Sequence, residues 1–290
     1  MSPRSRELRS LAMRAWFTIA LLGSASMLGC GQQLDVGSDV VWTARFENGD
    51  LSEWMSVLGG GAAAFPAPNV VDVSKGQAWR GQYAARLAIQ TASDGSQANA
   101  GLSRTGFLPA EAYYSAWYYL PAAVKVSTFW VIFKFRMRSV ADDASTVAEL
   151  FDLNLANTSS GGMTLRLYDH RAGDIPLDVA APTVPVATWF QIEAYYRNPG
   201  SSPGTTDGGG TDGSAADGGA PNDSGRLTYW LDGQKILDVT GPMAPTSWVA
   251  WDVVSVAVNL NPSAAVLYVD DCAISRTRVG PHGIIAASSN

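Results

Sequence analysis

The sequence has very few cysteines and histidines. Its only cysteines are Cys30 and Cys272, and its only histidines are His170 and His282. We expect Cys30 to carry a lipid, for reasons given below, which leaves Cys272 unpaired and provides no disulfide framework. No Cys/His cluster with metal-ligand spacing, phosphate-binding glycine loop or GxSxG motif is present. These absences remove the sequence signatures of zinc sites, nucleotide-binding loops and serine hydrolases.

Positive charge is also scarce. The formal net charge is −6, and 47% of the residues are hydrophobic. Residues 1–29 contain four arginines and one glutamate, so the chain without them loses a net +3 and carries −9. An acidic, apolar-rich chain of this length can bury a sizeable core and is a poor nucleic-acid binder. We therefore expect a globular protein with no nucleic-acid partner.

Long apolar runs are absent after Cys30, but the N-terminus has the layout of an export signal. Arginines precede the run AWFTIALLG, and the sequence MLGC ends at Cys30. The last residues resemble a bacterial lipobox, in which the cysteine receives palmitate-type acyl chains. The resemblance predicts a lipoprotein whose lipid is its only membrane attachment, and Gly31 after the cysteine favours the outer membrane or cell surface. An ordinary secretory signal with a chance cysteine is the alternative.

The segment Thr128 to Arg138, TFWVIFKFRMR, alternates two chemistries with a period of two. Successive side chains of a strand point to opposite faces, so this segment predicts a strand with one apolar and one basic, aromatic face. The apolar face consists of Phe129, Val131, Phe133, Phe135 and Met137, and the other of Trp130, Ile132, Lys134, Arg136 and Arg138. We expect Phe133 and Phe135 to be buried between two sheets, with the cations directed into a groove.

Similar alternation recurs along the chain, and no convincing amphipathic helix appears. The sequence therefore predicts an all-β protein, most simply a two-sheet antiparallel jelly roll. Residues 198–225 contain no large apolar side chain, which predicts a disordered insertion within this domain. The expected organisation is a signal peptide at 1–29, a tether at 30–40, the jelly roll at 41–276 and a tail at 277–290.

Several motifs together carry a family resemblance. ARFENGDLSEW, YYSAWYYLP, FKFRMR, WFQIEAYYRN, GRLTYWLDGQKILD and LYVDDCAIS resemble concanavalin A-like jelly-roll proteins of the bacterial polysaccharide lyase and carbohydrate-binding type. The resemblance implies paired terminal strands and a concave sheet that holds a glycan. It also implies a structural Ca²⁺ ion bound by Glu47 and by Asp270 or Asp271. Such carboxylates supply only part of a calcium shell, and surface turn acids are the alternative.

Sorting the strands by parity collects aromatic, amide and basic groups into one set. Aromatic rings stack on pyranoses, and guanidinium groups match carboxylates, so this set predicts a site for an anionic, uronate-containing polysaccharide. Exposed strand cations paired with acids are the alternative. The predicted ligand-binding residues are Trp117, Trp130, Lys134, Arg136, Arg138, Arg166, Gln191, Glu193, Arg197, Trp230 and Asn259. We expect a monomer.

The same set could catalyse β-elimination on a uronate polymer. Tyr168 with His170, or Tyr195, could transfer the protons, and Arg136 with Gln191 or Asn259 could serve the carboxylate. Three functions stay open: polysaccharide binding, which we favour, a polysaccharide lyase, and a structural or adhesive surface protein. Tyr168, His170 or Tyr195 within hydrogen-bond reach of Arg136 and of a Gln or Asn on one concave face would favour the lyase. A scattered arrangement would favour simple binding or a structural role.

A glycosidase is less favoured. The segment ELFDLN contains Glu149 and Asp152, which are three residues apart, with Asn154 where a further acid would be expected. Strand parity places the two acids on opposite faces unless a bulge intervenes, so they would not flank one glycosidic bond.

Overall fold

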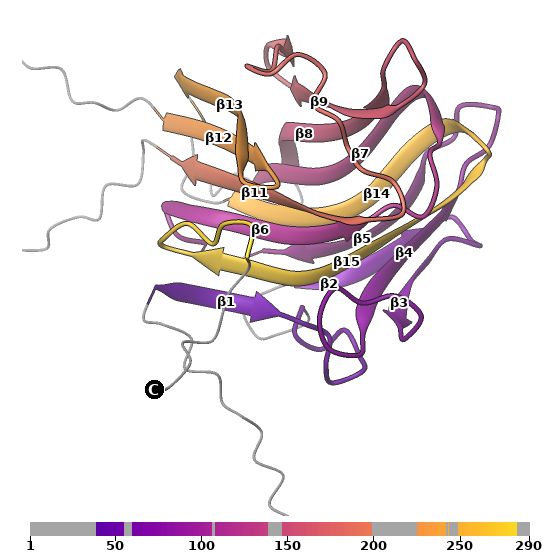
Figure 1. Cartoon of the computed structure of the whole chain (residues 1–290), viewed down its shortest axis with the longest axis horizontal. Coiled ribbons are helices and arrows are strands. Elements are labelled where there is room, and N and C mark those ends of the chain that lie inside the picture. Colours follow the sequence, from indigo (N-terminus) through magenta and orange to yellow (C-terminus); the bar gives the residue numbers. More distant parts are fainter. Residues whose placement is uncertain are drawn as a thin grey trace, which may run out of the picture. The chain divides into compact units, whose positions relative to one another are not determined.

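The computed structural model describes residues 39–54, 60–105, 108–138, 147–198, 225–241, 243 and 249–282. The expected signal peptide with Cys30, residues 199–224 of the expected insertion and most of the tail lie outside these ranges. Within them the chain forms fifteen strands in two sheets, and every strand pairing is antiparallel (Figure 1). No helix in the described part is long and apolar enough to cross a membrane. The all-β, two-sheet jelly roll is confirmed.

The eight-stranded sheet has the order β13-β12-β11-β6-β15-β4-β3, with β1 also paired to β15. The first and last strands are thus neighbours, with Ala44 opposite Cys272. Its strands are β1 (Val40–Ala44), β3 (Val70–Ser74), β4 (Ala84–Gln90), β6 (Glu111–Tyr119), β11 (Trp189–Arg197), β12 (Gly225–Leu231), β13 (Gln234–Gly241) and β15 (Ala264–Ser275).

The seven-stranded sheet has the order β10-β9-β8-β7-β14-β5-β2. Its central strands β7, β14 and β8 are long and lie side by side (Figure 1). Its strands are β2 (Gly60–Phe65), β5 (Ala98–Arg104), β7 (Lys125–Arg138), β8 (Val147–Asn157), β9 (Met163–Asp169), β10 (Gly173–Ile175) and β14 (Val249–Asn261).

The main core lies between the two sheets and is rich in aromatic rings. Phe133 and Phe135 are fully buried there, as expected. Phe135 contacts Tyr114 edge-on at 5.1 Å and Tyr196 at 4.9 Å, between ring centroids, which joins the seven-stranded sheet to β6 and β11. Burying such a ring contributes about 2 to 3 kcal/mol to the free energy of unfolding. Because Phe133 and Phe135 are fixed in the core, the alternating residues Lys134 and Arg136 point away from it.

Two β-bulges interrupt the parity of β7 and β8. In β7, Ile132 is an extra residue, so Ile132 and Phe133 both face the core. In β8, Leu150 is an extra residue, and Leu150 and Phe151 both face the core. A bulge reverses the faces of the residues on one side of it. Two sequence-based expectations are therefore wrong, as the next paragraph describes.

Trp130 does not lie on the polar face with Lys134. Its indole is fully buried in the main core and donates to the hydroxyl of Ser255. Val131 takes the outward position and packs with Val254 and Val256. In β8 the bulge brings Glu149 and Asp152 to the same outer face, where sequence parity had separated them.

Candidate functional site

A cavity of about 600 Å³ lies on the outer face of the seven-stranded sheet. Strands β7, β8 and β9 supply most of its polar lining, because their outward side chains alternate with core residues. The chemically active lining residues are Lys134, Glu149, Asp152, Asn154, Arg166, Tyr168 and His170.

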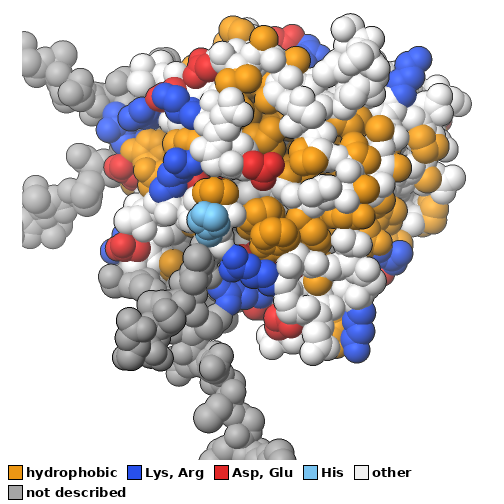
Figure 2. All heavy atoms as spheres, in the orientation of Figure 1, with side chains coloured by type: hydrophobic (Ala, Val, Ile, Leu, Met, Phe, Trp, Pro, Cys, Tyr) orange, Lys and Arg blue, Asp and Glu red, His pale blue; other side chains and the backbone are white. Residues whose placement is uncertain are grey.

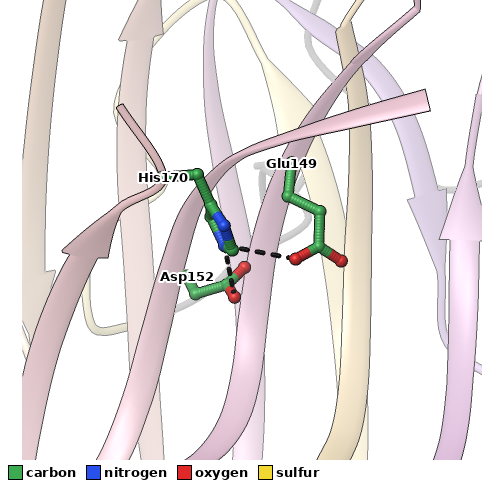
Figure 3. Close-up of side chains that lie close together, drawn as sticks. All are labelled: Glu149, Asp152 and His170. Atoms are coloured by element: carbon green, nitrogen blue, oxygen red, sulfur yellow. Dashed lines mark hydrogen bonds and ion pairs between the residues drawn. The ribbon is translucent and has the colours of Figure 1, made fainter. Parts of the chain in front are cut away.

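Four of these side chains form a compact charged group, which we call the Lys134 cluster: Lys134, Glu149, Asp152 and His170. The Nζ atom of Lys134 lies 2.5 Å from Oε1 of Glu149 and 3.6 Å from Oδ1 of Asp152. Nε2 of His170 lies 2.8 Å from Oδ2 of Asp152 and 3.2 Å from Oε2 of Glu149. Figure 3 shows the imidazole directed at both carboxylates. Each carboxylate thus faces both Lys134 and the imidazole.

Burial divides this cluster into a fixed and an accessible part. The side chains of Lys134 and Asp152 are only 7% and 8% exposed, whereas those of His170 and Glu149 are 30% and 42% exposed. Burial raises the pKa of the Asp152 carboxyl, and Lys134 and His170 oppose that shift. Asp152 therefore anchors the floor of the cavity, and the imidazole and Glu149 are within reach of a ligand.

The Lys134 cluster has the donor atoms of a metal site. One ligand atom each of Glu149, Asp152 and His170 lie within 4.8 Å of one another. The ammonium group of Lys134, however, already contacts both carboxylates. Because this ammonium group supplies the positive charge that a metal ion would bring, Lys134 itself holds the two carboxylates together.

Tyr168 is next to the Lys134 cluster on β9. It is 38% exposed, lies opposite Asp152 in the strand register, and its ring meets that of His170 edge-on at 5.1 Å. Arg166 lines the same cavity, and its guanidinium binds Asp174. Asn154 is buried opposite Arg166. The cavity thus combines a phenol, an imidazole, an amide and two paired cations.

Three other predicted residues on the seven-stranded sheet do not join this group. Arg136 binds Asp252 and the hydroxyl of Ser103, and it is not among the lining residues of the cavity. Asn259 adopts a φ of 50° on β14 and is likewise not among those lining residues. The side chain of Arg138 lies outside the described part. Arg136 therefore does not line the cavity that holds Tyr168 and His170, contrary to the sequence-based expectation.

The remaining predicted residues belong to the eight-stranded sheet, so the single polar face expected from parity is divided between two sheets. Tyr195 is among them, and its burial, together with the hydrogen bond from its hydroxyl to Glu111, raises the pKa of Tyr195 to about 12. Tyr195 is therefore not part of the site around Tyr168 and His170. The others are Trp117, Gln191, Glu193, Arg197 and Trp230.

Segments outside the strands cover this second face. Trp79 stacks on Trp117 at 3.8 Å, and the backbone N–H groups of Trp79 and Arg80 donate to Asp270. Glu193 is fully buried and accepts hydrogen bonds from Arg278, Val279 N and Gly280 N. Figure 2 views this side and shows hydrophobic side chains in its middle, with charged ones around them. The polar groups beneath the cover hold the segments in place.

The residues expected to bind calcium are engaged with other donors. Glu47 accepts from the backbone N–H groups of Gln82 and Tyr83. Asp270 accepts from three backbone N–H groups, and Asp271 faces Arg45 and Arg80. Calcium needs six to eight oxygen ligands and is repelled by guanidinium groups. This arrangement does not fit a calcium ion, and no step of the chemistry below uses one.

No family model matches the sequence, and no curated protein matches it. Solved structures do match the fold. Endo-β-1,4-glucuronan lyase from the fungus Trichoderma reesei aligns over 86% of this chain and 100% of its own, with a TM-score of 0.56 and 11% identity. Alginate lyase vAL-1 from Chlorella virus aligns over 82% and 100%, with a TM-score of 0.51 and 12% identity. The chain therefore has the jelly-roll fold that these polysaccharide lyases share.

Proposed function

We propose that the protein binds a uronate-containing polysaccharide in the cavity of the seven-stranded sheet and cleaves it by β-elimination. The observation that carries the proposal is the meeting of Tyr168 and His170, two proton-transfer groups, beside the amine of Lys134 in one cavity. The fold shared with two lyases of uronate polymers supports it. The sequence favoured binding over cleavage, and we now favour cleavage because Tyr168 and His170 lie together in the cavity, although Arg136 does not join them.

The reaction requires three kinds of group. A base takes the proton on C5 of the uronate, and a cation or amide stabilises the negative charge that spreads onto the carboxylate. The C4–O bond then breaks, a C4=C5 double bond forms, and an acid protonates the leaving oxygen. A neutral His170 that donates Nε2–H to Asp152 carries its lone pair on Nδ1, which suits the base. The Tyr168 hydroxyl suits the acid that protonates the leaving oxygen. The ammonium group of Lys134 suits the cation that stabilises the charge on the uronate carboxylate.

A glycosidase needs renewed consideration because the bulge at Leu150 removes the parity objection to Glu149 and Asp152. Two catalytic carboxylates must lie on opposite sides of the scissile bond, about 5 Å or more apart. Here both carboxylates contact the same Nζ and Nε2 atoms. These shared partners argue against a pair of carboxylates that flanks one glycosidic bond.

Binding without cleavage is the second candidate. It is favoured by the ion pairs of the cavity, since Lys134 and Arg166 each already contact a carboxylate.

We also infer export and lipid attachment at Cys30 from the sequence alone. This would place the cavity where extracellular polymers reach it.

The direct test incubates the purified protein with glucuronan, alginate, pectate and heparin-like polymers and follows the ultraviolet absorbance of unsaturated uronate. A rise with one polymer is expected. No rise with any of them, but retarded migration in a gel that contains one, would favour the binding function. The absence of both signals, with no absorbance rise and no retarded migration, would favour a structural or adhesive role.

A further inference from the structure

Glu149 is the most exposed member of the Lys134 cluster. Its carboxylate lies 2.5 Å from Nζ of Lys134, and its side chain is 42% exposed. Asp152 contacts the same amine from a buried position and is only 8% exposed. The whole side chain of Lys134 is only 7% exposed. A ligand that approaches Lys134 from the cavity therefore meets Glu149 before it meets the amine.

The contact between Glu149 and Lys134 can be exchanged. A partly exposed ion pair contributes little to stability because solvent screens it and because both side chains lose freedom. A uronate offers the same group, a carboxylate with two oxygens. It can form an equivalent ion pair with Lys134 if Glu149 rotates into solvent.

We propose that Glu149 stands in for the substrate's carboxylate, holding the position on Lys134 that a uronate takes when it binds. This inference rests on the proposed function, because it concerns the same cavity and the same class of ligand. Glu149 then acts as an internal competitor, and Lys134 with Asp152 beneath it defines the carboxylate subsite. A neutral glycan has no group that replaces Glu149, so the competitor also selects for charged polymers.

The test measures the affinity of oligoglucuronate and oligomannuronate by titration calorimetry for the wild-type protein and for Glu149→Gln and Glu149→Ala. Gln keeps the size of the side chain without its charge. Ala removes the whole group and controls for any hydrogen bond that the Gln amide makes to the ligand. Both variants should bind a uronate oligomer about two- to fivefold more tightly, which corresponds to the loss of one weak ion pair.

Two controls separate this effect from others. Asp238→Asn removes the same charge from the eight-stranded sheet and should leave the affinity unchanged. A neutral β-glucan oligomer should bind no more tightly to either Glu149 variant than to the wild type. Unchanged or weaker uronate binding by both variants would overturn the inference, as would an equal gain for the neutral oligomer. Failure of the wild type and all variants to bind any uronate would overturn the proposed function as well.

Discussion

The outer faces of the two sheets carry similar side chains but use them differently. On the eight-stranded sheet, Gln191, Glu193 and Asp270 are at most 1% exposed. The backbone N–H groups of Trp79, Arg80, Val279 and Gly280 meet these acids from segments outside the strands. On the seven-stranded sheet, Lys134, Asp152 and His170 bond within their own cluster, and the imidazole reaches a cavity.

The hydrogen-bond partners of the polar side chains distinguish a structural polar face from a candidate site. A polar side chain that meets the backbone of a covering segment holds that segment in place. A group of polar side chains that meet one another beside an accessible cavity keeps donors and acceptors available to a ligand. A substitution on one face tests whether the other face responds.

The largest effect is expected at Lys134. Lys134→Met removes the cation proposed to stabilise the substrate carboxylate, and we expect kcat/KM on the cleaved polymer to fall at least about 100-fold. It also leaves Asp152 buried without its amine, which should lower the free energy of unfolding by about 3 kcal/mol. The matched variant Arg226→Met removes a cation from the other sheet. Equal activity of the two folded variants would contradict the assignment of the site.

A second effect is expected on the covered face, at Glu193. Glu193→Ala removes the acceptor of three hydrogen bonds from residues 278–280, and we expect a loss of about 2 to 3 kcal/mol in denaturant unfolding. Amide exchange at Val279 and Gly280 should become faster. Cleavage at a temperature where the variant stays folded should equal that of the wild type. Loss of cleavage by the folded variant would show that the two faces are coupled.

The acid Asp270 should make stability depend on pH. Burial, the largest cause, and the nearby Asp271 carboxylate raise the pKa of Asp270 to about 7. An unfolded aspartate loses its proton near pH 4, so from about pH 4 to 7 the folded state binds more protons. Unfolding free energy should therefore fall by about 1 kcal/mol per pH unit across this window and level off above it. Asp270→Asn should lack this slope, and an identical slope in both proteins would refute it.

The smallest effect is expected at the exposed pair of Arg226 and Asp238. The hydrogen bond from Arg226 is the main cause that lowers the pKa of Asp238. Its contribution is therefore present above the ordinary aspartate pKa and is lost as the pH falls below it. Asp238→Asn should cost less than about 1 kcal/mol at neutral pH, because the side chain of Arg226 is 45% exposed. A cost of several kcal/mol in urea titrations would show that exposed pairs stabilise this sheet more than we expect.

Much of the fold could be predicted from the sequence. The alternation in β7 placed Phe133 and Phe135 in the core because a strand anchored by apolar side chains has only one buried face. It misplaced Trp130 because Ile132 adds a residue to the strand. The only local sign of this bulge is the uninterrupted apolar run from Phe129 to Phe133.

The candidate site was harder to predict. Glu149 and Asp152 were set aside on parity, and the adjacent Leu150 and Phe151, both apolar, were the available sign of a bulge. Tyr168 and His170 were predicted because they end one strand together, and the structure brings them to one cavity. Tyr195 and Gln191 were grouped with them because parity gives the face of a strand but not the sheet to which the strand belongs.

The central claim is that the cavity of the seven-stranded sheet cleaves a uronate polymer and that the opposite face does not take part. The most direct measurement compares Tyr168→Phe with Tyr195→Phe, since each variant removes one hydroxyl from one face. We expect Tyr168→Phe to lower kcat about 100-fold or more, as for the loss of a general acid, and Tyr195→Phe to cleave like the wild type. Full activity of Tyr168→Phe, or an equal loss in both variants, would contradict the central claim.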